Sequence, residues 1–479
     1  MTDPTRFASP LSERYASRAM LELWSSQRRH SQWRRLWLAL AEAERELGVA
    51  EVTEEGLAQM RAHLDDIDFP AAAAFERRFR HDVVAHIETF AQAAPAARPF
   101  IHYGATSAFV TDNSDVILMR EGLELLRRKI LGVLRSLSAF ARTWRNEPAL
   151  AYTHLQPAQL TTVGKRATLW MQDLLLDLGD IDYRVATLPL RGVKGTTGTQ
   201  ASFLEIFHGD HGKVRRLEEL VVAKMGFSRA LPVTGQTYSR KVDAQVLGVV
   251  AGVAASGGKF SGDVRILQSY GELEEPFEQE QVGSSAMAYK RNPMRAERIA
   301  GLARFVISLE ENANNTHAAQ YLERTLDDSA NRRLVIPDMF LATDAILVLM
   351  ENISSGLEVH PDRIRKRIAA ELPFMATERL IVGAVKKGGS RQEAHATIRR
   401  HGLAAAAAMK DGAERNDLFE RLAVDGGLGL TLEEMHAAAQ AKDFIGRAPR
   451  QVEEFLDGVV EPLLARSPNQ PTEAEAPRV

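Results

Sequence analysis

The sequence predicts an all-α protein organised around a bundle of long helices. The clearest support is an apolar seam from Val116 to Trp144, which advances in alternating three- and four-residue steps, the period of one buried helix face. Long helical stretches alternate with short polar loops along the chain, and it lacks the repeated Val, Ile and Thr alternation that would indicate strands. These observations predict helices that bury wide faces against one another.

Composition and charge exclude several classes of protein. The 479 residues include 60 Lys and Arg against 63 Asp and Glu, so the formal charge of -3 gives no field that would attract nucleic acid or an anionic membrane. The lack of cysteine excludes disulfides, thiolate metal sites and cysteine nucleophiles. The first ten residues show no signal pattern, and the longest uncharged run, Ala244 to Gly258, is too short to span a bilayer. We therefore expect a cytoplasmic protein with no membrane or nucleic-acid partner.

Two polar segments in the N-terminal quarter are suited to anions. The stretch LSERYAS contains Arg14 and Tyr15, a pair able to hold a phosphate or a carboxylate, although a solvated turn has the same composition. Residues 32–46 then predict an amphipathic helix. Further on, Arg-His-Asp at residues 80–82 precedes an apolar turn. The two histidines of this segment lie five residues apart, which would not place two metal ligands on one helix face, so no zinc site is predicted.

Polar loops flank the long apolar seam. Before it, a glycine-containing turn carries Thr106 and Ser107, and we expect the helix to begin near Asn113 or Ser114; a plain capping role would also explain the two hydroxyls. After it, Thr153 and His154 lie just before Pro157 and therefore on a loop. A lone histidine is more often structural than catalytic. A Gly/Thr-rich loop that begins at Arg191 and holds Gln200 is, by itself, a weak indication of a ligand.

Helical patterns continue through the second half of the chain. Residues 240–273 form a predicted helix dotted with Ala, Gly and Ser, which indicates close helix-to-helix approach, and a further helix is expected from about 294 to 321. The next segment is an arginine cluster suited to phosphate or carboxylate, with Arg324, Ser329, Arg332 and Arg333. The helix after it contains Pro337, which should kink it or mark its first turn. Beyond residue 359 shorter helices interrupted by glycines predict a separate domain.

Residues 283–299, GSSAMAYKRNPMRAERI, form the most informative stretch. Two serine hydroxyls follow a glycine, and Lys290, Arg291 and Asn292 supply positive charge and an amide donor before a helix expected to open at Pro293. This composition is typical of a loop that closes over an anion. A basic surface loop has a similar composition, so the residues alone leave both interpretations open.

This stretch resembles the signature loop GSSxMPxKxN of the fumarase/aspartase superfamily of lyases. One departure is Ala288, which stands where the family has proline and adds backbone freedom that costs roughly 0.4–1 kcal/mol to order. Other loops match in the same order along the chain, and they are similar to the superfamily branch that acts on the succinyl ribotides of purine synthesis: SERYAS, RHDVVAH, HYGATS, THLQPAQLTTVGKR, KGTTGTQASF and ERTLDDSANRR.

The resemblance implies a domain organisation and an assembly. It implies an N-terminal helical domain over 1–111, a central long-helix bundle over 112–359 with the signature loop at 281–295, and a C-terminal helical domain over 360–465. Residues 466–479 are rich in Pro, Glu and Ala, and we expect them to be a disordered tail. The family assembles as a homotetramer with a twenty-helix core and active sites shared among three subunits, and we expect the same here.

The resemblance also implies a reaction, an anti β-elimination that releases fumarate without any metal or organic cofactor. By position in the motifs, Ser284 is the base, His154 is the general acid with Glu297 as its carboxylate partner, and Lys290 and Asn292 stabilise the anion. The implied substrate-binding residues are Arg14, Tyr15, Arg80, His81, Asp82, His102, Thr106, Ser107, Thr153, Gln200, Arg298, Arg324, Ser329 and Arg333.

Three alternatives stay open at this stage. Another fumarate-releasing lyase, such as argininosuccinate lyase or fumarase, would not need the arginine cluster or the RHDVVAH loop for a phosphate. A non-catalytic scaffold protein would not need to keep Ser284, Lys290, Asn292, His154 and Glu297 together. A nucleic-acid-binding module is disfavoured because the arginines are scattered among acidic residues.

Overall fold

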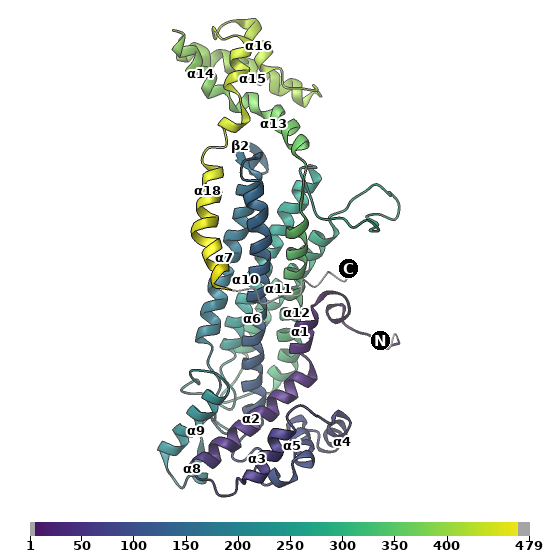
Figure 1. The fold of residues 1–479 in the computed structure, drawn as a ribbon, viewed down its shortest axis with the longest axis vertical. Helices are drawn as coiled ribbons and strands as arrows, with labels where there is room; N and C mark the ends of the chain where they lie inside the picture. Colours follow the sequence, from purple (N-terminus) through teal and green to yellow (C-terminus); the bar gives the residue numbers. More distant parts are fainter. Residues whose placement is uncertain (1–4, 468–479) are drawn as a thin grey trace.

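Long helices run side by side through the middle of the molecule (Figure 1). The computed structural model describes residues 5–467. Within that range, five helices build the central bundle: α6 (Ser107–Thr143), α7 (Val163–Thr187), α10 (Lys241–Ser269), α11 (Met294–Ala318) and α12 (Asp327–Gly356). Each packs on its neighbours, most extensively α10 on α11 and α11 on α12. The predicted all-α class with a long-helix bundle is confirmed.

Of the N-terminal helices, α3, α4 and α5 lie at one end of this bundle, whereas α1 packs on α6 and α12 and α2 extends along α6 and α9 (Figure 1). Their bounds are η1 (Leu11–Tyr15), α1 (Arg18–Leu23), α2 (Ser26–Glu46), α3 (Glu54–Ala62), α4 (Phe69–Phe79), α5 (Asp82–Ala93) and η2 (Pro95–Ala97). Two further helices, α8 (Ala201–Ile206) and α9 (His211–Lys224), lie at the same end. The expected boundary between residues 111 and 112 falls inside α6, so the N-terminal part ends before Ser107.

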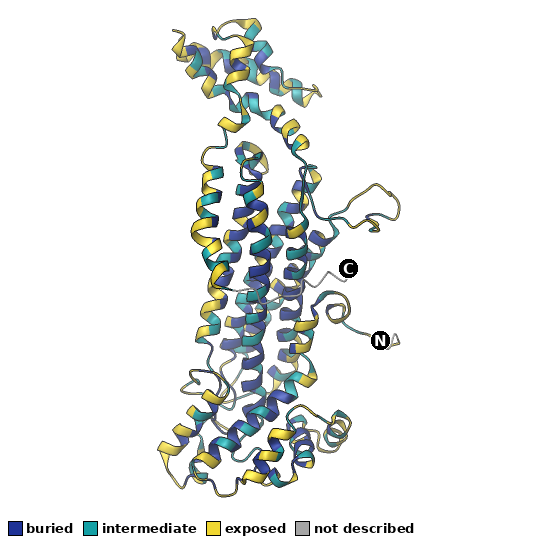
Figure 2. Cartoon of the chain, in the orientation of Figure 1, coloured by how far each residue is buried: buried dark blue, intermediate teal, exposed yellow. Residues whose placement is uncertain are grey.

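The C-terminal helices divide between two places. Their bounds are α13 (Pro361–Met375), α14 (Thr377–Lys386), α15 (Arg391–Lys410), α16 (Leu418–Asp425), α17 (Leu432–Ala438), η3 (Ala441–Asp443), α18 (Ala448–Phe455), η4 (Leu456–Val460) and α19 (Glu461–Arg466). Buried residues between 376 and 435 form a hydrophobic cluster of their own at the far end of the molecule (Figure 2). Helix α18, in contrast, returns to pack on α7, so the end of the expected 360–465 domain belongs with the bundle. Most of the expected tail, residues 468–479, lies outside the described residues.

Helix α6 confirms the apolar seam and corrects its start. All the seam residues from Val116 to Phe140 are buried, and Trp144 packs partly buried at the end of the helix. The helix begins at Ser107, six residues before Asn113, which was expected near its start. Asn113 is instead fully buried and links α6 to the loop at Gly192. Its side-chain amide donates hydrogen bonds to the carbonyl oxygens of Phe109 and Gly192 and accepts one from the Gly192 N–H. An Asn side chain can cap a helix or form buried hydrogen bonds, so the residue type alone did not distinguish these two roles.

Short antiparallel strand pairs interrupt the helical pattern. The hairpin of β1 (Pro148–Thr153) and β2 (Gln156–Thr162) was not expected, and a second pair joins β3 (Leu273–Glu274) to β4 (Glu358–Val359). The β1–β2 pairing shifts register between Leu150 and Tyr152. β3 and β4 have only two residues each, and β1 has two adjacent buried residues, so these strands do not show the alternation that identifies a strand in a sequence.

Close helix approach explains the small residues of α10. A Cβ atom added at Gly257 would lie 2.5 Å from Cγ2 of Ile346 on α12, so glycine is required for the two helices to pack at this distance. Pro337 lies well inside α12 and not in its first turn. In the described part of the chain, no helix is long and apolar enough to cross a membrane.

Replacing Glu44 by leucine should raise the free energy of unfolding by about 1–3 kcal/mol near neutral pH. Glu44 on α2 is fully buried, and neither carboxyl oxygen has a hydrogen-bond partner among the described residues. Burial and the nearby charge of Glu51 raise the pKa of Glu44 well above its ordinary value of 4.5. The folded state therefore keeps a proton that the unfolded state releases, and stability is lost as pH rises above about 4.5 toward the folded pKa.

Urea unfolding at about pH 5 and about pH 7.5 tests this, because the gain from leucine should be larger at the higher pH. Glu46→Leu is the matched control, since Glu46 lies on the same helix but is exposed. A Glu44→Leu protein less stable than wild type at both pH values would show that the carboxyl group has a stabilising partner.

Candidate active site

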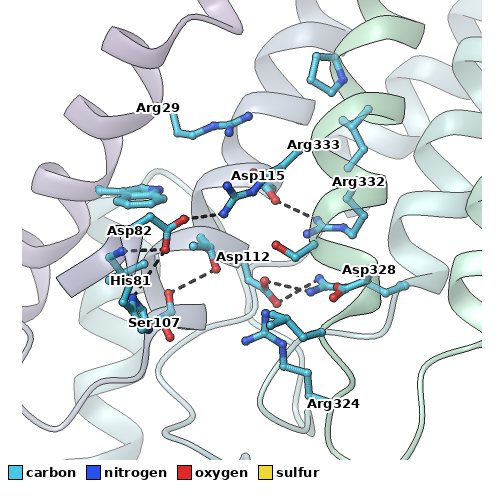
Figure 3. A pocket seen from close by; sticks show the side chains of 18 of the residues that line it. Arg29, His81, Asp82, Ser107, Asp112, Asp115, Arg324, Asp328, Arg332 and Arg333 are labelled. Atoms are coloured by element: carbon cyan, nitrogen blue, oxygen red, sulfur yellow. Dashed lines mark hydrogen bonds and ion pairs between the residues drawn. The ribbon is translucent and has the colours of Figure 1, made fainter. Parts of the chain in front are cut away.

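An arginine-rich cavity of about 330 Å³ lies where α2, α5, α6 and α12 meet (Figure 3). Seven of the predicted substrate-binding residues line it: Arg80, His81, Asp82, Ser107, Arg324, Ser329 and Arg333. They come from the α4–α5 junction, from the first residue of α6 and, more than two hundred residues later, from the start of α12 and the segment just before it. The fold thus brings together motifs that the sequence could only list in order.

Buried ion pairs form the floor of the cavity and fix the start of α12. Arg240 lies 2.7 Å from Asp328 and 3.2 Å from Asp112, and all three side chains are almost fully buried. Arg332 lies 2.6 Å from Asp243 and 3.0 Å from Asp115. Arg332 is therefore a structural member of the predicted arginine cluster, held by carboxylates. The pairs anchor α12 to α6 and α10, which leaves Arg324, Ser329 and Arg333 to line the cavity.

The Arg-His-Asp segment forms one wall. Arg80 has a left-handed backbone (φ 57°) at the end of α4, and His81 Nδ1 accepts the Val84 N–H at the start of α5. Asp82 accepts a 2.5 Å hydrogen bond from Arg333 across the cavity. Burial alone would raise the pKa of Asp82, but the hydrogen bond and charge of Arg333 outweigh it and hold the pKa below its ordinary value. Arg333 and Asp82 thus hold each other in place at the cavity wall.

A chain of hydrogen bonds joins Arg324 to the start of α6. The Arg324 guanidinium donates to Oε1 of Gln236 (2.9 Å), and Nε2 of Gln236 donates to the Thr106 hydroxyl (3.3 Å). Sequence reasoning missed Gln236 and chose Gln200. The Gln200 amide is used internally, because Nε2 donates to the carbonyl oxygen of Val193 within the Gly/Thr loop. The TGQT segment around Gln236 has the same Gly/Thr composition as the loop that holds Gln200. No other feature of the TGQT segment indicated a binding residue.

His102 is held as a neutral imidazole near this wall. Its Nδ1 accepts the Trp37 indole N–H at 2.8 Å, which places its own proton on Nε2. Burial and the nearby charge of His81 lower the pKa of His102 to about 4. His102 is therefore available as a hydrogen-bond donor throughout the neutral pH range.

His154 lies at the tip of the β1–β2 hairpin. Thr153 pairs with Gln156, so His154 and Leu155 form a two-residue turn, and both have positive φ values (54° and 57°). Positive φ at both positions is the geometry of a tight hairpin turn. Thr153 and His154 are exposed, in agreement with the predicted loop position. Among the described residues, no hydrogen bond or ion pair links His154 to Glu297 or to the signature loop.

The signature loop extends away from the bundle before α11 (Figure 1). Asn292 Nδ2 donates to the carbonyl oxygen of Gly283 (2.7 Å) and closes the base of the loop. A Cβ at Gly283 would lie 2.1 Å from the carbonyl oxygen of Lys290, so only glycine fits this crossing. The Ser284 hydroxyl accepts the backbone N–H groups of Met287 (3.1 Å) and Ala286 (3.3 Å). Two donors thus already point at the oxygen expected to act as the base.

Glu275 anchors the loop to the N-terminus of α11. Its two carboxylate oxygens accept the backbone N–H groups of Arg295 (3.0 Å) and Ala296 (2.9 Å), although the side chain is 2% exposed. Burial raises the pKa of Glu275 despite these bonds. Glu297 is exposed on the first turn of the same helix. Sequence reasoning missed Glu275 because a carboxylate that caps a distant helix leaves no local pattern.

Tyr15 and Arg298 meet beside this helix start. The guanidinium carbon of Arg298 lies 5.8 Å from the centre of the Tyr15 ring, within the range of a cation–π contact. Arg14 is exposed next to Tyr15. The N-terminal motif and the end of the signature motif therefore form one cluster.

Three potential metal ligands approach one another under the loop, Glu274, Glu358 and His360, with ligand atoms within 4.8 Å. Arg291 lies 3.1 Å from Glu274 and 3.2 Å from Glu358 and forms an ion pair with both carboxylates. The contact ties the end of the signature loop to β3 and β4, so we assign the cluster a structural role.

The predicted site residues thus fall into separate groups within one chain. One group lines the cavity, a second lies on the hairpin tip, and a third lies on the signature loop with Tyr15 and Arg298. A lyase of the fumarase/aspartase type uses these motifs in a single reaction. The long-helix bundle and the signature loop therefore place the protein in this class of lyases.

Comparison with known proteins supports this class and narrows it. The family described as "Lyase" matches residues 6–308, and "Adenylosuccinate lyase C-terminus" matches residues 373–455. Adenylosuccinate lyase of Saccharomyces cerevisiae is 50% identical over 458 residues, 95% of each protein, and that of Schizosaccharomyces pombe is 48% identical over 467 residues, 97% of each. The chain therefore belongs to the adenylosuccinate lyase family.

Solved structures show the same fold at lower identity. A 3-carboxy-cis,cis-muconate lactonizing enzyme from Pseudomonas putida aligns with a TM-score of 0.81 and 22% identity, covering 94% of this chain and 98% of that one. A fumarate lyase from Mesorhizobium aligns with a TM-score of 0.78 and 23% identity, covering 93% and 99%. At this identity the likeness extends to the fold alone.

Proposed function

We propose that the protein catalyses the anti β-elimination of fumarate from adenylosuccinate, giving AMP, and from succinyl-aminoimidazole-carboxamide ribotide, giving AICAR, in the cytoplasm. Family membership over nearly the whole chain supports the reaction. The observation that carries the substrate assignment is the cavity, where Arg324, Ser329 and Arg333 line a space suited to a phosphate. Both ribotides carry one phosphate and an N-linked succinyl group, and they differ in whether the second purine ring is closed.

The reaction needs a base, an acid and a stabilised anion. The base removes a proton from the succinyl Cβ, the electron pair forms the double bond as the C–N bond breaks, and the acid protonates the leaving nitrogen. Ser284 is the proposed base. A serine hydroxyl is a weak base, so its alkoxide must be favoured, and the two backbone N–H groups already directed at its oxygen provide this stabilisation.

Lys290 and Asn292 are the proposed stabilisers of the negative charge that develops on the succinyl carboxylate. Lys290 is exposed on the loop, and its ammonium group makes no ion pair with another described residue. The Asn292 amide presently closes the base of the loop. His154 is the proposed general acid and Glu297 its carboxylate partner. Closure of the loop over the substrate would bring these charges to the reacting carbon and exclude water.

We infer a homotetramer in which different subunits contribute these groups to one site. Among the described residues of one chain, no hydrogen bond or ion pair joins His154 on the hairpin tip to Ser284 on the signature loop. Elimination nevertheless needs the acid and the base on one substrate. Large apolar side chains are exposed on the bundle helices, among them Leu169, Leu176 and Tyr183 on α7 and Phe305 on α11. A partner subunit would cover them.

The purified protein should cleave both ribotides in an ultraviolet assay and should not cleave argininosuccinate. Argininosuccinate has no phosphate, so it would leave the cavity arginines unpaired, which a polar site disfavours strongly. Arg333→Ala should raise KM for both ribotides by about 10- to 100-fold, because it removes a charged hydrogen-bond donor. Turnover of argininosuccinate at rates comparable with the ribotides would contradict the substrate assignment.

A further inference from the structure

We propose that Arg29, on α2, is a further binding residue for the substrate phosphate. This inference rests on the proposed function and names a contact that no motif of the chain indicates. Arg29 lines the same cavity as Arg324 and Arg333, and Figure 3 shows its guanidinium group directed from α2 into the space between α2 and α12.

The charges of the cavity leave Arg29 without a carboxylate of its own. Six of the described arginines line the cavity: Arg29, Arg80, Arg240, Arg324, Arg332 and Arg333. Arg240 and Arg332 are held in the buried ion pairs of the floor, and Arg333 is paired with Asp82. The positive charge of Arg29 acts on Asp115, but that carboxylate already forms an ion pair with Arg332 at 3.0 Å. Arg29, Arg80 and Arg324 therefore supply positive charge for a ligand.

Arg29 also has an unsatisfied donor. Its Nε atom is buried and has no hydrogen-bond partner among the described residues, and Arg324 Nε, on the opposite side of the cavity, is in the same state. Buried guanidinium donors without partners are unfavourable, and an anion that accepts from a guanidinium group here would reduce that penalty. Trp24 and Trp33 also line the cavity, so a charged hydrogen bond formed there is partly shielded from water.

The phosphate fits this position better than the succinyl carboxylates. In the proposed mechanism Lys290 and Asn292 already bind the succinyl carboxylate beside the carbon that loses its proton, so the arginines of the cavity remain for the phosphate. The phosphate is at the opposite end of the ribotide. Its three terminal oxygens can accept hydrogen bonds from several guanidinium groups at once.

Product inhibition separates the two anions, because AMP carries the phosphate and fumarate carries the carboxylates. Arg29→Gln should raise KM for adenylosuccinate by about 10- to 100-fold and weaken inhibition by AMP by a similar factor, with inhibition by fumarate changed less than about twofold. Arg29→Lys, which keeps the charge and loses the planar fork, should fall between Arg29→Gln and wild type. Arg28→Gln is the matched control, since Arg28 precedes it on α2 but pairs with Glu121 outside the cavity.

Unchanged KM and AMP inhibition in Arg29→Gln would overturn the proposal. Equal weakening of AMP and fumarate inhibition would also overturn it, because that result would mean a general disturbance of the site. Absence of adenylosuccinate cleavage by the wild-type protein would instead contradict the proposed function. In that case, calorimetry with AMP and adenosine still tests Arg29, because only the binding of AMP should depend on it.

Discussion

Ser284→Ala should lower kcat for both ribotides by about 10²- to 10⁴-fold while the protein stays folded. The substitution removes the hydroxyl of the described loop that accepts two backbone N–H groups and is proposed to take the proton. Ser284 lies on an extended loop and not in the core, so its loss should leave helix content and thermal stability unchanged. Steady-state kinetics with circular dichroism measures both.

Ser285→Ala is the matched control, since Ser285 is the adjacent hydroxyl on the same loop and is exposed. It should keep wild-type kcat to within a few fold. Near-normal turnover of Ser284→Ala would remove Ser284 as the base and would require another group for proton abstraction.

His154→Ala should cause a second loss of about 10²- to 10⁴-fold in kcat, because the leaving nitrogen would depart without a proton. The effect should fall mainly on kcat and less on KM, since the cavity that holds the phosphate does not include His154. His208→Ala is the matched control: His208 is also exposed and has a positive φ of 52°. A His154→Ala protein with normal kcat would contradict the role of general acid.

The long helices were predictable because they depend on the regular spacing of apolar and small residues along the sequence. The seam of α6 and the small residues of α10 indicated buried and closely approaching helices, and the structure confirms both. The β1–β2 hairpin was missed, since its register shift and its two-residue turn at His154 depend on pairing that no local pattern reports. The start of α6 was misplaced because Asn113 resembles a helix cap and is instead a buried link to Gly192.

The candidate site was predictable only where a motif marked it. The residues on Arg-His-Asp and on the start of α12 do line one cavity. Gln236 and Glu275 bond to distant segments, and Arg29 lines the cavity from a helix that carries no motif, so their neighbours in the sequence do not indicate them. Gln200 was chosen for its loop, but the amide is engaged within that loop.

The central claim is that one active site takes His154 and Ser284 from different subunits. Mixing the inactive His154→Ala and Ser284→Ala proteins, with partial unfolding and refolding together, tests it directly. If the subunits combine at random, about a quarter of the sites receive an intact residue from each variant, and activity should recover to about a quarter of wild type. A mixture that native mass spectrometry shows to contain hybrid oligomers, but that stays as inactive as its parents, would contradict the shared site.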